Sequence, residues 1–150
     1  MIRRSTVARA LLLLLAAPAM IGSVGPRSNF DERILAAHNR ERDLMSAPPL
    51  EWDEELAAGA RAWADHLSRS GRFEHSPDDE DQPPQGENIW GGTPGYFLPE
   101  SMVALWIEEK QHFVPGIFPG NSRTGRVEDV SHYTQLIWSR TDRVGCAAST

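Results

Sequence analysis

The sequence predicts one small domain of the α+β class, in which helices and long loops outweigh strands. Apolar residues recur at helical spacing in three segments, and two stretches rich in proline and glycine follow the second and third of these. A short Val-Gly-Cys-Ala run near the C-terminal end is typical of a buried strand. A chain of 150 residues is long enough for one domain with one hydrophobic core.

Residues 1–25 are predicted to be a secretory signal peptide and not part of the domain. Three arginines precede an apolar run at residues 11–15, and Ala17-Pro18-Ala19 offers a small-residue cleavage site. The apolar run is too short to span a bilayer comfortably, which makes an uncleaved anchor the weaker alternative. We expect cleavage between about Ala19 and Gly25. The product is a secreted domain of residues 26–150 with no integral membrane segment.

The expected mature domain is acidic. Removing residues 1–25 takes away three arginines and no acid, so 12 basic and 21 acidic residues remain, a net charge of −9. Nucleic acids and anionic membranes repel such a surface, and we expect neither as a partner. The acidic run at residues 78–81 is interpreted as a solvated loop tip.

Two helices are predicted before residue 72. Residues 30–45 place Phe30, Ile34 and Ala37 at helical spacing, and two prolines at residues 48 and 49 end that helix. The second helix begins at the N-cap Asp53 and stops at Gly71. Its apolar stripe consists of Leu56, Ala60, Trp63 and Leu67.

A third helix is predicted to begin near Pro99 and to include Phe113. Proline- and glycine-rich loops precede and follow it, at residues 76–98 and 115–130. Loops of this length in so small a domain are unusual unless they build a site or are disordered. Because Trp90, Tyr96 and Phe97 lie in the first loop, we expect that loop to pack.

Three common catalytic signatures are absent from the sequence. It has no H-E-x-x-H zinc-protease motif, no G-x-S-x-G acyl-hydrolase elbow, and no glycine-rich phosphate loop after a strand. Cys146 lies in the predicted buried strand, not in the exposed, electropositive setting that a thiolate nucleophile needs. We therefore expect no general protease or esterase activity.

The five histidines have different settings along the chain. His38 on the first helix is interpreted as a hydrogen-bonded structural residue, and His66, off the apolar stripe, as exposed. His112 is compatible with either role. His75 and His132 stand at the edges of the two loops. Spacing alone gives no metal signature, because no two candidate ligands are close in sequence.

Several short motifs follow one another along the chain. They are HNRER at residues 38–42, PLEW at 49–52, HS at 75–76, GENI at 86–89, WIEE at 106–109, HYTQLIW at 132–138 and VGCA at 144–147. In this order they resemble the CAP domain of cysteine-rich secretory proteins, antigen 5 and plant pathogenesis-related proteins, here as a bacterial-type secreted member. The resemblance implies a three-layer α-β-α sandwich around a short antiparallel sheet.

The resemblance also implies a central cleft lined by two histidines and two glutamates from distant segments. Carried over residue by residue, these are His75, Glu87, Glu109 and His132. Glu109 is preferred over Glu108 because the motif places it three residues after Trp106. Two imidazoles and two carboxylates suit a divalent metal ion, zinc above others. They equally suit a pH-sensitive network without metal, or a polar cleft that only braces the fold.

A further expectation concerns the C-terminal end. The resemblance implies another strand after residue 147, commonly with a cysteine that would pair with Cys146. The sequence ends at Thr150. We therefore expect the C-terminal strand to be missing and interpret the chain as a fragment or a truncated form.

The leading functional prediction is a secreted CAP protein whose cleft binds its ligand without turning it over. The resemblance implies sterols or other lipids, or partner proteins, as ligands. One alternative is a metal-dependent hydrolase that uses the same cleft, with a glutamate as base. The other is a structural or signalling module of the envelope with an inert cleft.

Overall fold

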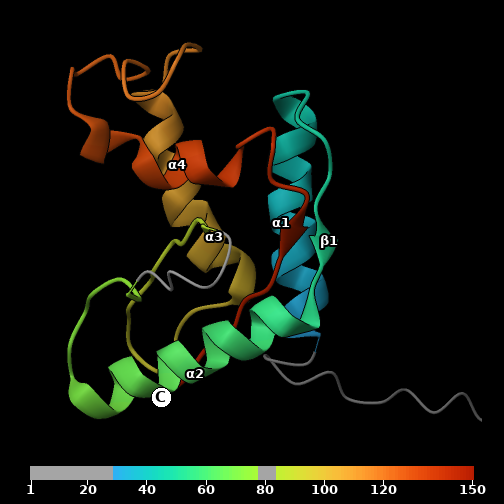
Figure 1. The fold of residues 1–150 in the computed structure, drawn as a ribbon, viewed down its shortest axis with the longest axis vertical. Helices are drawn as coiled ribbons and strands as arrows, with labels where there is room; N and C mark the ends of the chain where they lie inside the picture. The colour runs from blue at the N-terminus through green and yellow to red at the C-terminus, as the bar shows by residue number, and fades with distance from the viewer. Residues whose placement is uncertain (1–28, 78–83) are drawn as a thin grey trace, which may run out of the picture.

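The computed structural model describes residues 29–77 and 84–150, and Figure 1 shows the order of its elements. The described α-helices are α1 (Phe30–Leu44), α2 (Glu54–Ser70), α3 (Pro99–Ile107) and α4 (Ser131–Leu136). Two 3₁₀ helices, η1 (Glu108–Gln111) and η2 (Val127–Asp129), and two strands, β1 (Glu51–Trp52) and β2 (Arg143–Val144), complete this part of the chain. The predicted signal peptide and the acidic run at residues 78–81 lie outside the described residues.

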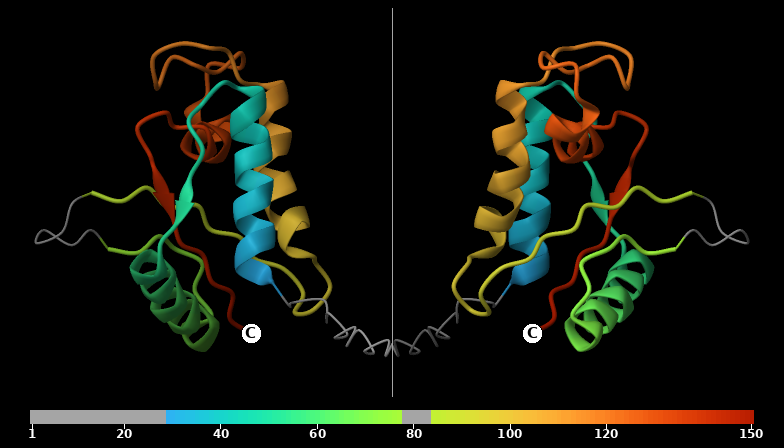
Figure 2. Two further views of the ribbon diagram at one scale, coloured as in Figure 1. Left: turned by 90° about the vertical axis from the view of Figure 1, so that its right-hand side faces the viewer. Right: turned by 90° about the vertical axis from the view of Figure 1, so that its left-hand side faces the viewer.

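The core lies where α1, α3 and α4 meet. Figure 2 shows α1 and α3 side by side, with α4 near the end at which both helices finish. Ile34 and Ala37 of α1 are buried against Val103 of α3 and Leu136 of α4. The helical spacing of the first two residues is what turns both toward this core, so the predicted apolar face of α1 is confirmed.

The strands β1 and β2 pair in parallel, with Glu51 opposite Arg143 and Trp52 opposite Val144. The backbone N–H of Glu51 donates to Asp142 O, and that of Asp53 donates to Val144 O, both at 2.9 Å. The expected antiparallel sheet is therefore wrong for these strands. The physical reason is the connection, since α2, α3 and α4 all lie between them. A long crossover permits parallel pairing, whereas a short hairpin joins antiparallel strands.

Helix α2 stands apart from the other helices (Figures 1 and 2). Its predicted ends are confirmed, because the Asp53 carboxylate accepts from two first-turn N–H groups and Gly71 ends it with a φ of 67°. None of its residues is fully buried, so the apolar stripe is only half-covered. The extended segment after β2 crosses closely here, where a Cβ on Gly145 would come within 2.1 Å of Ala57 N.

The predicted third helix is shorter than expected. It begins at Pro99, as predicted, but α3 ends at Ile107 and the chain tightens into η1. His112 N donates to Glu109 O at 2.9 Å and Phe113 N donates to Lys110 O at 3.1 Å, the i→i+3 pattern of a 3₁₀ turn. Glu109 therefore lies on a tight turn at the end of α3.

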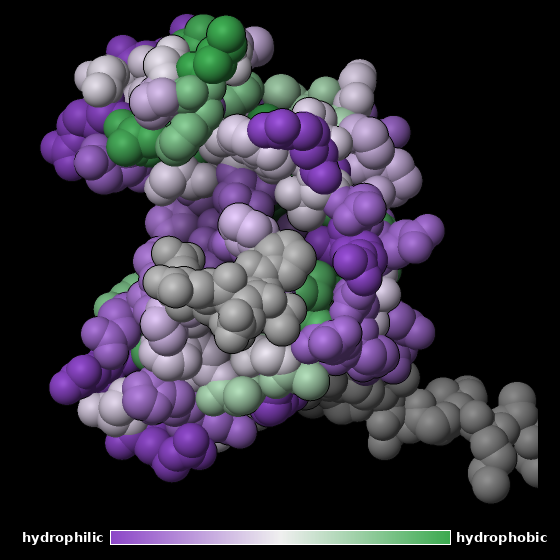
Figure 3. Space-filling model, in the orientation of Figure 1, coloured by the Kyte–Doolittle hydropathy of each residue, from purple (hydrophilic) through white to green (hydrophobic). Residues whose placement is uncertain are grey.

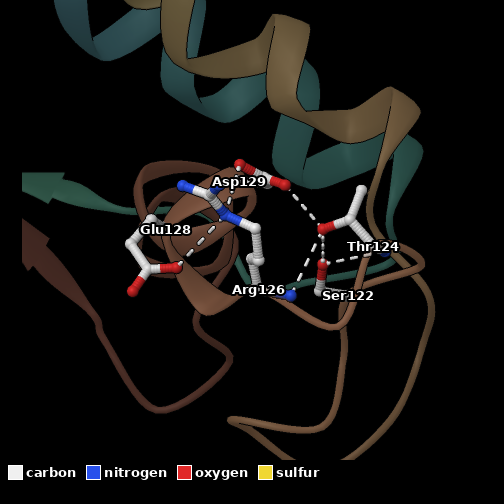
Figure 4. Close-up of polar contacts among 5 residues, drawn as sticks. All are labelled: Ser122, Thr124, Arg126, Glu128 and Asp129. Atoms are coloured by element: carbon white, nitrogen blue, oxygen red, sulfur yellow. Dashed lines mark hydrogen bonds and ion pairs between the residues drawn. The ribbon is translucent and has the colours of Figure 1, made fainter.

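The loop that precedes α4 is held by its own polar contacts. Figure 4 shows Thr124 Oγ1 donating to Asp129 Oδ2 at 2.5 Å, with Arg126 Nε 3.8 Å from the other carboxylate oxygen. Deeper in the loop, Val114 N donates to Asn121 O at 2.9 Å. These contacts order the backbone just before the helix that carries His132. Within residues 29–77 and 84–150, no helix is long and apolar enough to cross a membrane.

Candidate functional site

Glu109 of η1 and His132 of α4 contact each other and are called the inner pair. His132 Nδ1 lies 2.6 Å from Glu109 Oε1, and Tyr133 N donates to Glu109 Oε2 at 3.0 Å. The first N–H groups of a helix have no partner within the helix, so Glu109 satisfies one of them at the start of α4. One carboxylate thus fixes both the helix start and the imidazole beside it.

The outer pair, His75 and Glu87, holds the start of the first long loop against the GENI segment in the middle of that loop. His75 Nδ1 lies 2.6 Å from Glu87 Oε1, which also accepts the backbone N–H of Ser76 at 3.1 Å. The outer pair is more open to solvent, because His75 is 63% exposed and His132 is 36% exposed. Both pairs nevertheless follow the same pattern, in which a glutamate holds Nδ1 of a histidine and a neighbouring backbone N–H.

This pattern decides which ring nitrogen is free. An ionised carboxylate only accepts hydrogen bonds, so Nδ1 of each ring must carry the proton. In the neutral ring, Nε2 of His75 and of His132 then keeps a lone pair, and neither atom has a hydrogen-bond partner among the described residues. A histidine oriented in this way by a carboxylate is typical of metal ligands.

The two pairs meet at one cavity. It has a volume of about 300 Å³, at the lower end of the range for ligand sites. His75, Glu87 and His132 line it, whereas Glu109 is not among the lining residues and is linked to the cavity through His132. Phe118 and Trp138 form an apolar wall. Figure 3 shows the surface hollowed between the part that contains the loop of residues 115–130 and the part that contains α2.

One face of the segment from Ser131 to Trp138 also lines the cleft, which was not predicted from the sequence. Ser131, Thr134, Gln135 and Trp138 all line the cavity. Their spacing of three, four and seven residues from Ser131 is the spacing of one helix face, and that signal could have found them. The GENI segment packs directly on this face, because a Cβ on Gly86 would come within 2.1 Å of Gln135 Nε2.

The four predicted site residues are therefore brought together as two hydrogen-bonded pairs. Among the described residues, no group of three or more histidine, cysteine, aspartate or glutamate side chains is arranged to hold a metal ion. The glutamates face the Nδ1 atoms of the histidines and not a common centre. Any metal ligation by this site would come first from the two free Nε2 atoms.

Other candidate residues have structural settings. His38 is buried and its Nδ1 donates to Ile34 O at 2.8 Å, as expected of a structural histidine. His66 is exposed and stacks on Trp63. Cys146 follows β2 instead of lying in a strand, and burial, with a smaller contribution from Asp31, raises the pKa of its thiol to about 12. At neutral pH this thiol is protonated and cannot act as a nucleophile.

The aromatic residues of the first loop pack against one another, as predicted. The Trp90 and Phe97 ring centroids lie 4.8 Å apart, and those of Tyr96 and Phe97 lie 5.1 Å apart. A second cavity beside them has a volume of about 60 Å³. That volume corresponds to roughly two water molecules, which makes it far too small for a sterol in this conformation.

Comparison with known proteins agrees with the motifs. The model of the family described as "CAP: Cysteine-rich secretory protein family" matches residues 35–150. The chain is 35% identical over 114 residues to pathogenesis-related protein 1 of Arabidopsis thaliana, covering 75% of this chain and 63% of that protein. It is 30% identical over 119 residues to pathogenesis-related protein 1C of Nicotiana tabacum, covering 79% and 66%.

A mouse protein, glioma pathogenesis-related protein 1, is 30% identical over 130 residues, which is 79% of this chain and 47% of that protein. The chain thus spans less than two thirds of the length of these curated relatives. They come from plants and mouse, so they give no support to the expectation of a bacterial-type member.

Proposed function

We propose that this chain, which belongs to the cysteine-rich secretory protein (CAP) family, is a secreted binding domain. Its cleft would take up a divalent cation, zinc above others, together with a small ligand. The observation that carries the proposal is the free Nε2 of both His75 and His132 at the edge of one cavity.

The chemistry of the donor set fits zinc. Neutral imidazole is a common zinc ligand, and a carboxylate on the opposite ring nitrogen fixes the tautomer and makes the ligand more basic. His75 and His132 would hold the ion through Nε2, while Glu87 and Glu109 would orient them. Zinc bound there would supply a Lewis acid that attracts an oxygen of the ligand. Two protein donors leave coordination positions for that ligand.

A catalytic role has less support. Among the described residues that line the cleft, no hydroxyl is hydrogen-bonded to a histidine or a carboxylate, and Cys146 is held as a thiol. Glu109 has both carboxylate oxygens committed, to His132 and to Tyr133 N. Only Glu87 keeps an oxygen, Oε2, without a partner among the described residues. A hydrolase that uses the cleft would therefore need Glu87 as its base.

The ligand class follows from the walls of the cleft. Phe118 and Trp138 offer an apolar surface beside the two imidazoles, and their ring centroids are 6.1 Å apart. A lipid or a partner's side chain with one polar end would suit both parts. The cluster of Trp90, Tyr96 and Phe97 is the weaker place for a lipid, because these rings cover one another.

Calorimetry of the purified protein with zinc chloride tests the proposal. We expect one zinc per chain. Loss of the partner that orients a metal ligand lowers affinity roughly 10–100-fold. His75→Ala and His132→Ala each remove a ligand itself, so each should lower zinc affinity by more than that. His66→Ala is the matched control, because it removes an exposed imidazole on α2. Zinc binding that survives both cleft variants would contradict the proposal. Turnover of a substrate that disappears in Glu87→Gln would favour the hydrolase instead.

A further inference from the structure

A buried carboxylate outside the cleft links the two elements that carry the inner pair. Glu41 of α1 is only 6% exposed. Its Oε1 accepts Lys110 Nζ at 2.8 Å and the Tyr133 hydroxyl at 2.7 Å. A buried carboxylate is costly unless it is paired and hydrogen-bonded, so these two contacts are strongly favoured.

The two partners of Glu41 are the immediate neighbours of the inner pair. Lys110 follows Glu109 on η1, and Tyr133 follows His132 on α4. One oxygen atom therefore fixes the distance between η1 and α4 at the point where Glu109 and His132 meet. Burial first, and then Glu41 itself, raise the pKa of Tyr133 well above its ordinary value, so the phenol remains a donor.

The next residue of α1 fixes the other end of α4. Arg42 is fully buried, and its Nη1 donates to Leu136 O at 2.9 Å and to Trp138 O at 3.1 Å. Its Nη2 donates to Thr141 O at 2.8 Å. Arg42 thus holds the backbone at the C-terminal end of α4, whereas Glu41 holds the side that faces Glu109.

We infer that Glu41 is a positioning residue for the cleft. It holds η1 and α4 so that Glu109 engages Nδ1 of His132 and leaves Nε2 toward the cavity. The inference rests on the proposed cation site for its function, but the geometry that it explains exists without any cation. Within the described part of the chain, no hydrogen bond joins the outer pair to Glu41, Lys110 or Tyr133, so His75 is an internal reference.

The test uses the zinc-free protein first. Long-range ¹H–¹⁵N spectra at pH 8 report which nitrogen of each imidazole carries the proton. In the wild type we expect both rings to carry it on Nδ1. In Glu41→Gln and in Tyr133→Phe we expect His132 to become a mixture of tautomers while His75 stays unchanged. Tyr133→Phe keeps the ring that packs on Phe113, so it decides the matter if Glu41→Gln does not fold.

Zinc calorimetry on the same variants gives the second readout. We expect affinity to fall by about tenfold, the low end for loss of a partner that orients a ligand. Asp53→Ala is the control for general destabilisation, because it removes the N-cap of α2 and should change neither readout. The inference is overturned if folded Tyr133→Phe keeps a single His132 tautomer and wild-type affinity, or if Asp53→Ala changes both equally. If the wild type binds no zinc, the proposed function fails and the tautomer result still decides the role of Glu41.

Discussion

The two cleft histidines are held alike but differ in how firmly the surroundings fix them. The His75 side chain lies largely in solvent, where an ion pair or hydrogen bond, here to the half-buried Glu87, contributes little to ordering. His132 and Glu109 are more enclosed and are tied to α1 through their neighbours. We therefore expect His132 to be the preorganised donor, and His75 to adjust as a cation or ligand enters.

The buried His38 is expected to make the stability of the fold depend on pH. Burial, and to a lesser degree the charge of Arg42, lower the pKa of His38 below its ordinary value of 6.5, although the hydrogen bond to Ile34 O acts in the opposite direction. Below about pH 6.5 the His38 imidazole binds a proton in the unfolded chain but stays neutral in the folded chain until the pH is lower. This part of the stability is present above pH 6.5 and is lost as the pH falls toward the folded-state pKa.

Urea unfolding at pH 7.5 and at pH 5.0 checks this linkage. The free energy of unfolding of His38→Gln should fall less between the two pH values than that of the wild type. His66→Gln, which replaces an exposed ring, should lose as much stability as the wild type. An unchanged pH dependence in His38→Gln would show that other groups govern acid stability.

At the level of elements, α4 shows why part of the site could not be predicted. A helix of six residues is too short to be stable alone, and the helical spacing of its cleft-lining residues covers too few turns to predict a helix by itself. Its order comes from Glu109 at its start and from the Arg42 contacts at its end, which join residues about 24 to 99 positions apart. α1 and α2, in contrast, have long apolar periodicity and clear end signals, and both were predicted from the sequence.

Two glycine substitutions test the packing between β2 and α2. Gly145→Ala should lower stability by about 1–3 kcal/mol, because the new Cβ would collide with backbone atoms at the start of α2 and not with a flexible side chain. Gly59→Ala is the matched control. Apart from its chain neighbours and the backbone of its own helix, no atom of the described residues lies within 4 Å of its added Cβ, so the change should raise stability by roughly 0.5–1 kcal/mol through helix propensity.

Thermal or urea unfolding of both variants measures these changes. If Gly145→Ala lowers the free energy of unfolding and Gly59→Ala raises it, the loss in Gly145→Ala comes from the contact between the C-terminal segment and α2. Equal effects would mean that this contact is not closely packed in solution.

On the scale of the whole molecule, the cleft is assembled by segments that are far apart in sequence. The motifs resembling the CAP domain named the four site residues, and the sequence placed both loops around them. The pairing of each glutamate with a histidine could not be predicted, because it depends on contacts across 12 and 23 residues. The parallel strand pair depends on a still longer crossover. The expected charge of the domain after loss of residues 1–25 is strongly negative and would attract a cation to the cleft.

We propose that Nε2 of His75 and Nε2 of His132 together form one cation site. The most direct measurement follows the ring nitrogens of both histidines by ¹⁵N NMR while zinc is added. We predict that the ¹⁵N chemical shifts of Nε2 in both rings change together. The change should be complete at one zinc per chain, and Nδ1 of each ring should keep its proton. A response of only one ring, separate responses at different zinc ratios, or loss of the Nδ1 proton would contradict the shared site.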